Sequence, residues 1–113
     1  MSFEQLPPSV REVLVRYQSL LRERFKDRLA ELRLFGSFAR QEAREDSDID
    51  VLVVIDGLTE SERDDAIDLA YDARSESDWV DLSPIVYSKA QAADLRGRER
   101  ALLRAIDAEG IAL

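Results

Sequence analysis

The sequence of 113 residues contains no cysteine and no histidine. Without cysteine there can be no disulfides, zinc–thiolate sites or thiol nucleophiles. Without histidine there is no imidazole to serve as a general base, nucleophile or metal ligand. Any chemistry must therefore come from carboxylates, hydroxyls, backbone amides and arginine.

Basic residues are in the minority: 16 Lys and Arg stand against 24 Asp and Glu, which gives a net charge of -8. A general nucleic-acid binder needs a basic surface, so we expect no direct nucleic-acid binding. The acidic balance is compatible with cation binding.

Long apolar segments are also absent. The longest apolar run covers residues 51–55, far short of the roughly 20 residues that span a bilayer. The N-terminus lacks the basic region and apolar stretch of a secretory signal, so we expect a cytoplasmic protein without a membrane partner. The length predicts one domain over residues 1–113, because domains usually have about 100 to 150 residues.

Helical and strand patterns alternate along the chain, which predicts an α/β (α+β) fold. Capping boxes at residues 9–12, 59–62 and 88–91 predict three helix starts. We expect a break in the last helical stretch at Gly97 and its end at Gly110. Its apolar residues Leu102, Leu103 and Ile106 fit either the core or an interface, and the core is favoured.

Strand patterns occur at residues 31–35, 49–55 and 79–87, and residues 111–113 fit a short extended segment. The almost continuous apolar run of residues 49–55 predicts a central strand buried on both faces. Pro84 lacks a backbone N–H, which favours an edge position for the third strand. We expect a small mixed sheet of three to four strands flanked by helices.

Gly36 and Ser37 follow the first predicted strand. A glycine there allows a sharp turn and close approach to a ligand, and the following amides can face an anion. The serine hydroxyl can donate to a phosphate oxygen. Taken alone, a Gly-Ser pair is most often only a turn.

Asp48 and Asp50 are one residue apart at the start of the buried strand, so their side chains point to the same face. Two converging carboxylates repel each other unless a cation lies between them, and oxygen ligands suit Mg²⁺. The alternative is a pair of solvated residues at a strand entry.

Asp81 lies within the third predicted strand, where a carboxylate needs a partner or an exposed face. An arginine partner is the structural alternative to a catalytic role, and Asp78 is a competing candidate for that role. Arg40 and Arg44 lie between the Gly-Ser turn and the carboxylates. They could reach triphosphate oxygens, or they could be surface cations.

Together, Gly36, Ser37, Asp48, Asp50 and Asp81 resemble the motif of the nucleotidyltransferases related to DNA polymerase beta. In particular, the chain is similar to the minimal nucleotidyltransferases, which are often antitoxins of HEPN-domain toxins. The resemblance spans nearly the whole chain. One departure is Gln41, where family members often have glycine.

The resemblance implies transfer of AMP from ATP, with Asp48, Asp50 and Asp81 as catalytic residues and ligands of two Mg²⁺ ions. Gly36, Ser37 and Arg40 are implied to bind the nucleoside triphosphate. The implied acceptor is a tyrosine of a HEPN toxin that forms a hetero-oligomer with the chain. Two alternatives stay open: transfer to a small molecule or RNA with a helical partner subunit, and neutralisation of the partner by binding without catalysis.

Overall fold

The structure is a computed structural model that describes residues 3–40, 42–43, 48–74, 81–98 and 101–113. The helices are η1 (Phe3–Gln5), α1 (Pro8–Phe25), η2 (Lys26–Arg28), α2 (Glu60–Ala73), α3 (Lys89–Gly97) and α4 (Ala101–Glu109), where η marks a 3-10 turn. The strands are β1 (Leu29–Phe35), β2 (Ile49–Ile55), β3 (Leu82–Ser88) and β4 (Ile111–Ala112).

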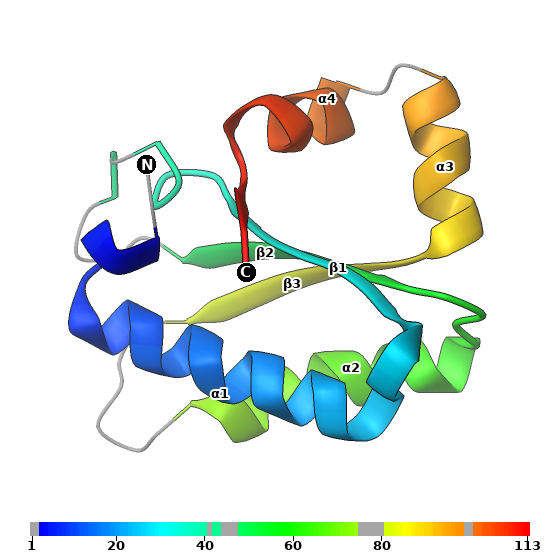
Figure 1. Cartoon of the computed structure of the whole chain (residues 1–113), viewed down its shortest axis with the longest axis horizontal. Coiled ribbons are helices and arrows are strands. Elements are labelled where there is room, and N and C mark those ends of the chain that lie inside the picture. Colours follow the sequence, from blue (N-terminus) through cyan, green and yellow to red (C-terminus); the bar gives the residue numbers. More distant parts are fainter. Residues whose placement is uncertain (1–2, 41, 44–47, 75–80, 99–100) are drawn as a thin grey trace.

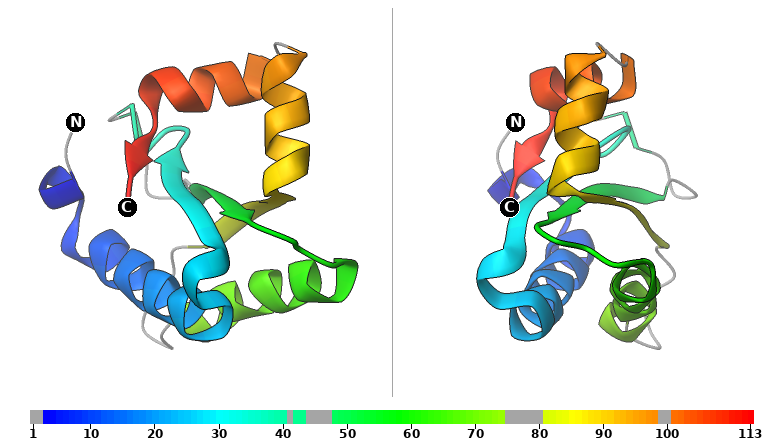
Figure 2. Two further views of the ribbon diagram at one scale, coloured as in Figure 1. Left: turned by 45° about the vertical axis from the view of Figure 1, so that its right-hand side comes forward. Right: turned by 90° about the vertical axis from the view of Figure 1, so that its right-hand side faces the viewer.

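The four strands form one mixed sheet in the order β3-β2-β1-β4. Strands β2 and β3 are parallel, whereas β1 pairs antiparallel with both β2 and β4. Helices α1 and α2 cover one face of the sheet, and α3 and α4 lie on the other (Figures 1 and 2). The predicted mixed sheet flanked by helices is confirmed.

Strand β2 is the buried centre of the fold. Val51 and Val53 pack in the larger core under α1 and α2, whereas Leu52 and Val54 pack against Leu103 of α4 on the other face. Because both faces are covered, the strand needs a continuous apolar run instead of an alternating one. The prediction of a central strand is therefore confirmed. Packing on both faces also fixes the position of the first residues of β2.

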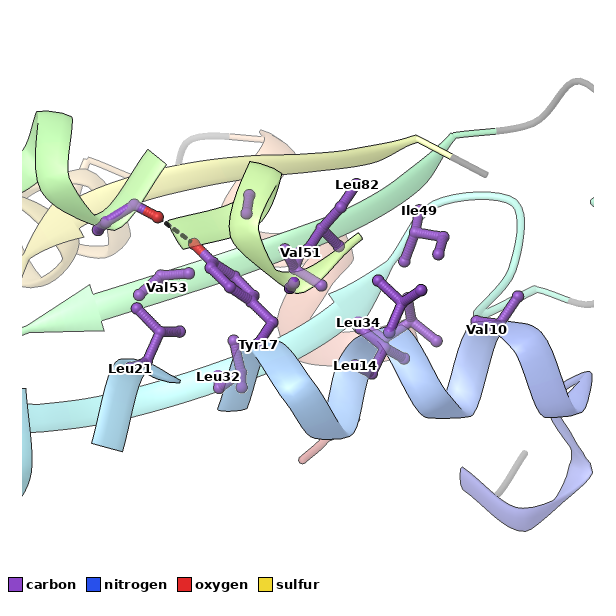
Figure 3. Close-up of a cluster of buried hydrophobic side chains, with 14 of the residues drawn as sticks. Val10, Leu14, Tyr17, Leu21, Leu32, Leu34, Ile49, Val51, Val53 and Leu82 are labelled. Atoms are coloured by element: carbon purple, nitrogen blue, oxygen red, sulfur yellow. Dashed lines mark hydrogen bonds between the residues drawn. The ribbon is translucent and has the colours of Figure 1, made fainter. Parts of the chain in front are cut away.

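Helix α1 supplies most of the larger core through residues at helical spacing. The side chains of Val10, Leu14, Tyr17 and Leu21 point at β1 and β2 (Figure 3). The Tyr17 hydroxyl donates a hydrogen bond of 2.8 Å to the carbonyl of Ala66 in α2, and burial raises the pKa of Tyr17. This bond satisfies a buried polar group and ties α1 to α2.

Two of the three predicted capping boxes are confirmed, at residues 59–62 and 88–91. The box predicted at Ser9 is wrong, because α1 begins one residue earlier, at Pro8, and Pro7 is its N-cap without a side-chain cap bond. Proline at the first helical position already has a helical φ and lacks the N–H that a cap would satisfy.

The other expectations concern the C-terminal half. Pro84 lies in the edge strand β3, as predicted, but the described part of this strand begins only at Leu82. The break at Gly97 is confirmed, and the Gly110 N–H donates to the Ile106 carbonyl at 2.7 Å where α4 ends. Leu103 and Ile106 are core residues, whereas Leu102 is exposed.

Among the described residues, no helix is both long enough and apolar enough to cross a membrane.

Candidate active site

The Gly-Ser turn packs directly on a carboxylate. Strand β1 ends at Phe35, which pairs with Asp50 of β2, so Gly36 emerges beside that residue. Gly36 has a φ of +75°, and a Cβ added there would collide with the Asp50 carboxylate oxygen Oδ2. Only glycine both adopts this left-handed backbone conformation without strain and leaves room for the Asp50 carboxylate. The glycine of the motif is therefore required by a contact as well as by a turn.

The segment after Gly36 makes a turn closed by two backbone hydrogen bonds. The Arg40 N–H donates to the Gly36 carbonyl at 3.1 Å, and the Glu42 N–H donates to the Ser37 carbonyl at 2.9 Å. Phe38 is buried in the larger core and anchors the turn. The backbone at Gly36 and Ser37 is thus held in place next to Asp50. Gln41 and Arg44 lie outside the described residues.

Asp48 and Asp50 flank the fully buried Ile49 at the start of β2, as the alternation of a strand requires. Asp48 is exposed and Asp50 is half-buried. Burial and the negative charge of Asp48 raise the pKa of Asp50, and the positive charge of Arg40 partly offsets this shift. The pair therefore has excess negative charge in a partly desolvated position.

Arg40, the third residue assigned to nucleotide binding, is engaged by acidic neighbours. Its Nε donates to Glu42 at 3.1 Å, and its Nη1 lies 3.7 Å from a Glu109 carboxylate oxygen. The hydrogen bond to Glu42 raises the pKa of Arg40. Arg40 thus links the Gly-Ser turn to the end of α4, and its role toward a nucleotide stays a prediction.

Asp81 lies immediately before β3, and its backbone is aligned with the two other carboxylates. The Ile49 N–H donates to the Asp81 carbonyl at 2.7 Å, and Asp50 pairs with Ser83 in register. The Asp81 side chain is exposed and forms an ion pair of 2.9 Å with Arg74, at the end of α2. The arginine partner considered from the sequence is therefore present. Asp78 lies outside the described residues.

A pocket of about 350 Å³ opens between the end of α2 and the starts of β2 and β3. Its polar lining consists of Asp48, Tyr71, Arg74, Asp81 and Ser83, and the remaining lining is apolar. Two of these five residues, Asp48 and Asp81, were candidates from the sequence. Tyr71, Arg74 and Ser83 were not candidates, and the available signal was that Tyr71 and Arg74 are three residues apart at the C-terminal end of α2.

Asp48 and Asp50 are the candidate ligands for Mg²⁺. Among the described residues, no three acidic side chains form a group that could hold a metal ion. Mg²⁺ is usually held by one or two carboxylates, with substrate phosphates and waters as its other ligands. Burial and the negative charge of Asp48 raise the pKa of Asp50, and the positive charge of Arg40 offsets this only in part. Asp48 and Asp50 therefore fit Mg²⁺ as a two-carboxylate site.

The nucleotidyltransferase domain family matches residues 17–104, which include the Gly-Ser turn and all three aspartates. The chain belongs to this family. A nucleotidyltransferase fold is also found by structural comparison. A crystal structure of a putative nucleotidyltransferase from Sulfolobus solfataricus superimposes with a TM-score of 0.54 and 20% identity, over 92% of this chain and 80% of that one. At this identity the likeness concerns the fold alone.

Similar sequences in this nucleotidyltransferase family are named protein adenylyltransferases. MntA of Thermococcus cleftensis is 48% identical over 39% of this chain and 42% of its own length. A putative protein adenylyltransferase of Methanocaldococcus jannaschii is 39% identical over 39% of this chain and 43% of its own. A second one from that organism is 33% identical over 69% of this chain and 79% of its own. The chain thus spans about two fifths of the first two relatives.

Proposed function

We propose that the chain is a Mg²⁺-dependent nucleotidyltransferase that transfers AMP from ATP to a tyrosine of a HEPN-domain toxin and acts as its antitoxin. The observation that carries the proposal is the packing of Gly36 on Asp50, with Asp48 on the same side of β2. This arrangement joins a phosphate-binding turn to a pair of undercompensated carboxylates. The relatives' name, protein adenylyltransferase, supports a protein acceptor.

Each residue has a defined task in this reaction. The backbone after Gly36 and the hydroxyl of Ser37 bind the terminal phosphates. Asp48 and Asp50 hold Mg²⁺, which when bound offsets the charge of the triphosphate and of the leaving pyrophosphate. Arg40 adds positive charge beside Asp50. The acceptor oxygen attacks the α-phosphorus in line, and the bond from that phosphorus to the β-phosphate breaks.

Asp81 completes the site by taking the proton of the acceptor hydroxyl or by acting as a third metal ligand. Its backbone is aligned with Asp48 through β2 and β3, but its carboxylate is paired with Arg74. The pair is exposed, so separating it costs little. We infer that Asp81 exchanges Arg74 for a new partner when the site is loaded.

Two features favour a partner protein as the acceptor of AMP: the net charge of the chain and the openness of the pocket. The pocket beside Asp48 and Asp81 is open, which allows a side chain of another protein to enter. The net charge of -8 favours docking on a basic protein, and an RNA-binding toxin is basic.

The test is incubation of the chain with α-labelled ATP, Mg²⁺ and the product of a neighbouring HEPN-type gene, followed by mass spectrometry of both proteins. We expect one adenylyl group on a tyrosine of the toxin. Asp48→Asn and Asp50→Asn should abolish the transfer. Asp56→Asn, at the opposite end of β2, is the matched control and should transfer AMP normally.

Three results would contradict the proposal. Transfer by the Asn variants at the wild-type rate would remove Asp48 and Asp50 from the metal site. Tight binding of the toxin with no AMP on either protein would instead support neutralisation by binding alone. Labelling of RNA or a small molecule, with the toxin unmodified, would support transfer of AMP to that molecule instead of to a protein.

A further inference from the structure

Tyr71 lines the pocket that also contains Asp48 and Asp81. It lies in the last turn of α2, and 66% of its surface is exposed, more than for any other large apolar side chain in the described part of the chain. A ring with this exposure contributes little to the core. Its phenol is therefore available to a reagent bound in the pocket.

Arg74 holds Tyr71 next to the candidate catalytic carboxylate. The Arg74 guanidinium carbon lies 5.4 Å from the centroid of the Tyr71 ring, within the range of a cation–π contact. The same guanidinium contacts Asp81 at 2.9 Å. One side chain thus bridges the tyrosine and the residue proposed to take the acceptor's proton.

The other two tyrosines of the chain have no such access. Tyr17 is fully buried and donates its hydroxyl hydrogen to Ala66. Tyr87 is half-buried in β3 and packs with the smaller core beside α3, on the opposite face of the sheet from α2. Tyr71 is therefore distinguished from the other two by both exposure and position.

We propose that Tyr71 is itself an acceptor of AMP, so that the chain adenylylates its own α2 in an intramolecular reaction. The inference rests on the proposed nucleotidyl transfer. The Tyr71 phenol oxygen forms a bond to the α-phosphorus of ATP, and the bond from that phosphorus to the bridging oxygen of the β-phosphate breaks. Pyrophosphate leaves with the electron pair. The phenolic proton passes to the Asp81 carboxylate and from there to water.

The experiment uses the full chain with α-labelled ATP and Mg²⁺ and without a partner, followed by peptide mass spectrometry. We expect the mass of one adenylyl group on the peptide that contains Tyr71. Tyr71→Phe should reduce incorporated label at least tenfold, whereas Tyr87→Phe should leave it unchanged. The label incorporated per molecule should rise at the same rate at all protein concentrations, since the reaction is intramolecular.

A second readout does not depend on turnover. Tetranitromethane nitrates exposed tyrosines, and Tyr71 should be protected when Mg²⁺ and α,β-methylene-ATP, an analogue that cannot transfer AMP, are bound. Nitration of Tyr87 serves as the internal control and should not change. Unaltered nitration of Tyr71 in the presence of the saturating analogue would place the nucleotide elsewhere and overturn the inference.

Failure of the inference and failure of the proposed function give different results. If the wild-type chain labels the HEPN protein but not itself, the nucleotidyl transfer stands and Tyr71 is not an acceptor. If neither protein is labelled, both proposals fail. A labelling rate per molecule that rises with protein concentration would overturn the intramolecular reaction.

Discussion

The carboxylate of Asp50 occupies the space in which a side chain at Gly36 would stand. The two residues are brought together by the antiparallel pairing of β1 with β2, in which Phe35 faces Asp50. The contact joins the two halves of the motif, one with the chemistry to bind phosphate and one with the chemistry to bind a cation. Altering either residue should therefore disturb the other.

Gly36→Ala should lower both stability and AMP transfer. A left-handed backbone costs a residue with a Cβ about 1–2 kcal/mol, and the new methyl group must also displace the Asp50 carboxylate. Gly57→Ala is the matched control, because Gly57 has a similar φ of +66° but only an arginine nitrogen at 3.9 Å near its Cβ position. In urea unfolding both variants should be destabilised, but only Gly36→Ala should lose transfer. Equal transfer by the two variants would argue against the contact.

Asp50→Asn should stabilise the free protein at pH 7 while abolishing transfer. Burial and the charge of Asp48 raise the pKa of Asp50 above its ordinary value of 3.8, so the folded state binds this proton more tightly than the unfolded chain does. The contribution of Asp50 to stability is therefore highest below that value and falls as the pH rises through the folded-state pKa of Asp50. The Asn variant escapes this loss, and its urea midpoint at pH 7 should exceed that of wild type. An unchanged or lower midpoint would contradict this account.

The same variant tests for Mg²⁺ without any reaction. A ligand that binds only the folded state stabilises it, and at ten times its Kd the gain is about 1.4 kcal/mol. Thermal unfolding of the wild type should shift upward with Mg²⁺, and that of Asp50→Asn should not. Asp56→Asn should behave like the wild type. Equal shifts in all three proteins would mean that the ion binds elsewhere.

Arg74→Gln should change the metal requirement without changing stability much. The Arg74–Asp81 pair is exposed, with 35% and 63% of the two side chains accessible, and such pairs contribute about 0–1 kcal/mol. Asp81 is proposed to leave Arg74 when Mg²⁺ and ATP bind. Removing Arg74 frees the Asp81 carboxylate in advance, so half-maximal AMP transfer should require a lower Mg²⁺ concentration. Arg24→Gln removes a comparable exposed pair with Asp65 and should leave that concentration unchanged.

Glu62→Gln should remove an acid-sensitive part of the stability. Arg28 donates two hydrogen bonds of 2.7 Å to Glu62, and these bonds lower the pKa of Glu62 from 4.5 to about 2. The stabilisation is complete above 4.5 and is lost as the pH falls toward 2. The variant should therefore have a lower urea midpoint than wild type at pH 7 and the same midpoint near pH 2. Glutamine at this position preserves the capping box, and Glu60→Gln controls for charge in the same helical turn.

Tyr17→Phe should destabilise the fold by about 0.5–1.5 kcal/mol, because it removes the hydrogen bond from a buried hydroxyl to the Ala66 carbonyl. Chemical denaturation measures the change. Tyr71→Phe removes a hydroxyl from an exposed ring and should alter the free energy of unfolding by less than about 0.5 kcal/mol. A loss of stability in Tyr71→Phe equal to that in Tyr17→Phe would contradict the role of the buried bond.

Much of the fold could be predicted from the sequence because its signals are local. The apolar run of β2 and the capping boxes at residues 59–62 and 88–91 each lie within one element. The box predicted at Ser9 failed because Pro7 and Pro8 already define the helix start. The candidate site was partly accessible for the same reason, since Asp48 and Asp50 are on one side of a single strand.

The rest depended on contacts between elements. The sequence alone determined three things: the spacing of Asp48 and Asp50, the lack of histidine and cysteine, and the position of the Gly-Ser turn. Strand alternation and side-chain chemistry need no tertiary information. Only the tertiary structure decided that Gly36 packs on Asp50, that Arg74 pairs with Asp81, and that Tyr71 lines their pocket. Each of these contacts joins residues from different elements, and their distances are set by how the sheet and α2 pack together.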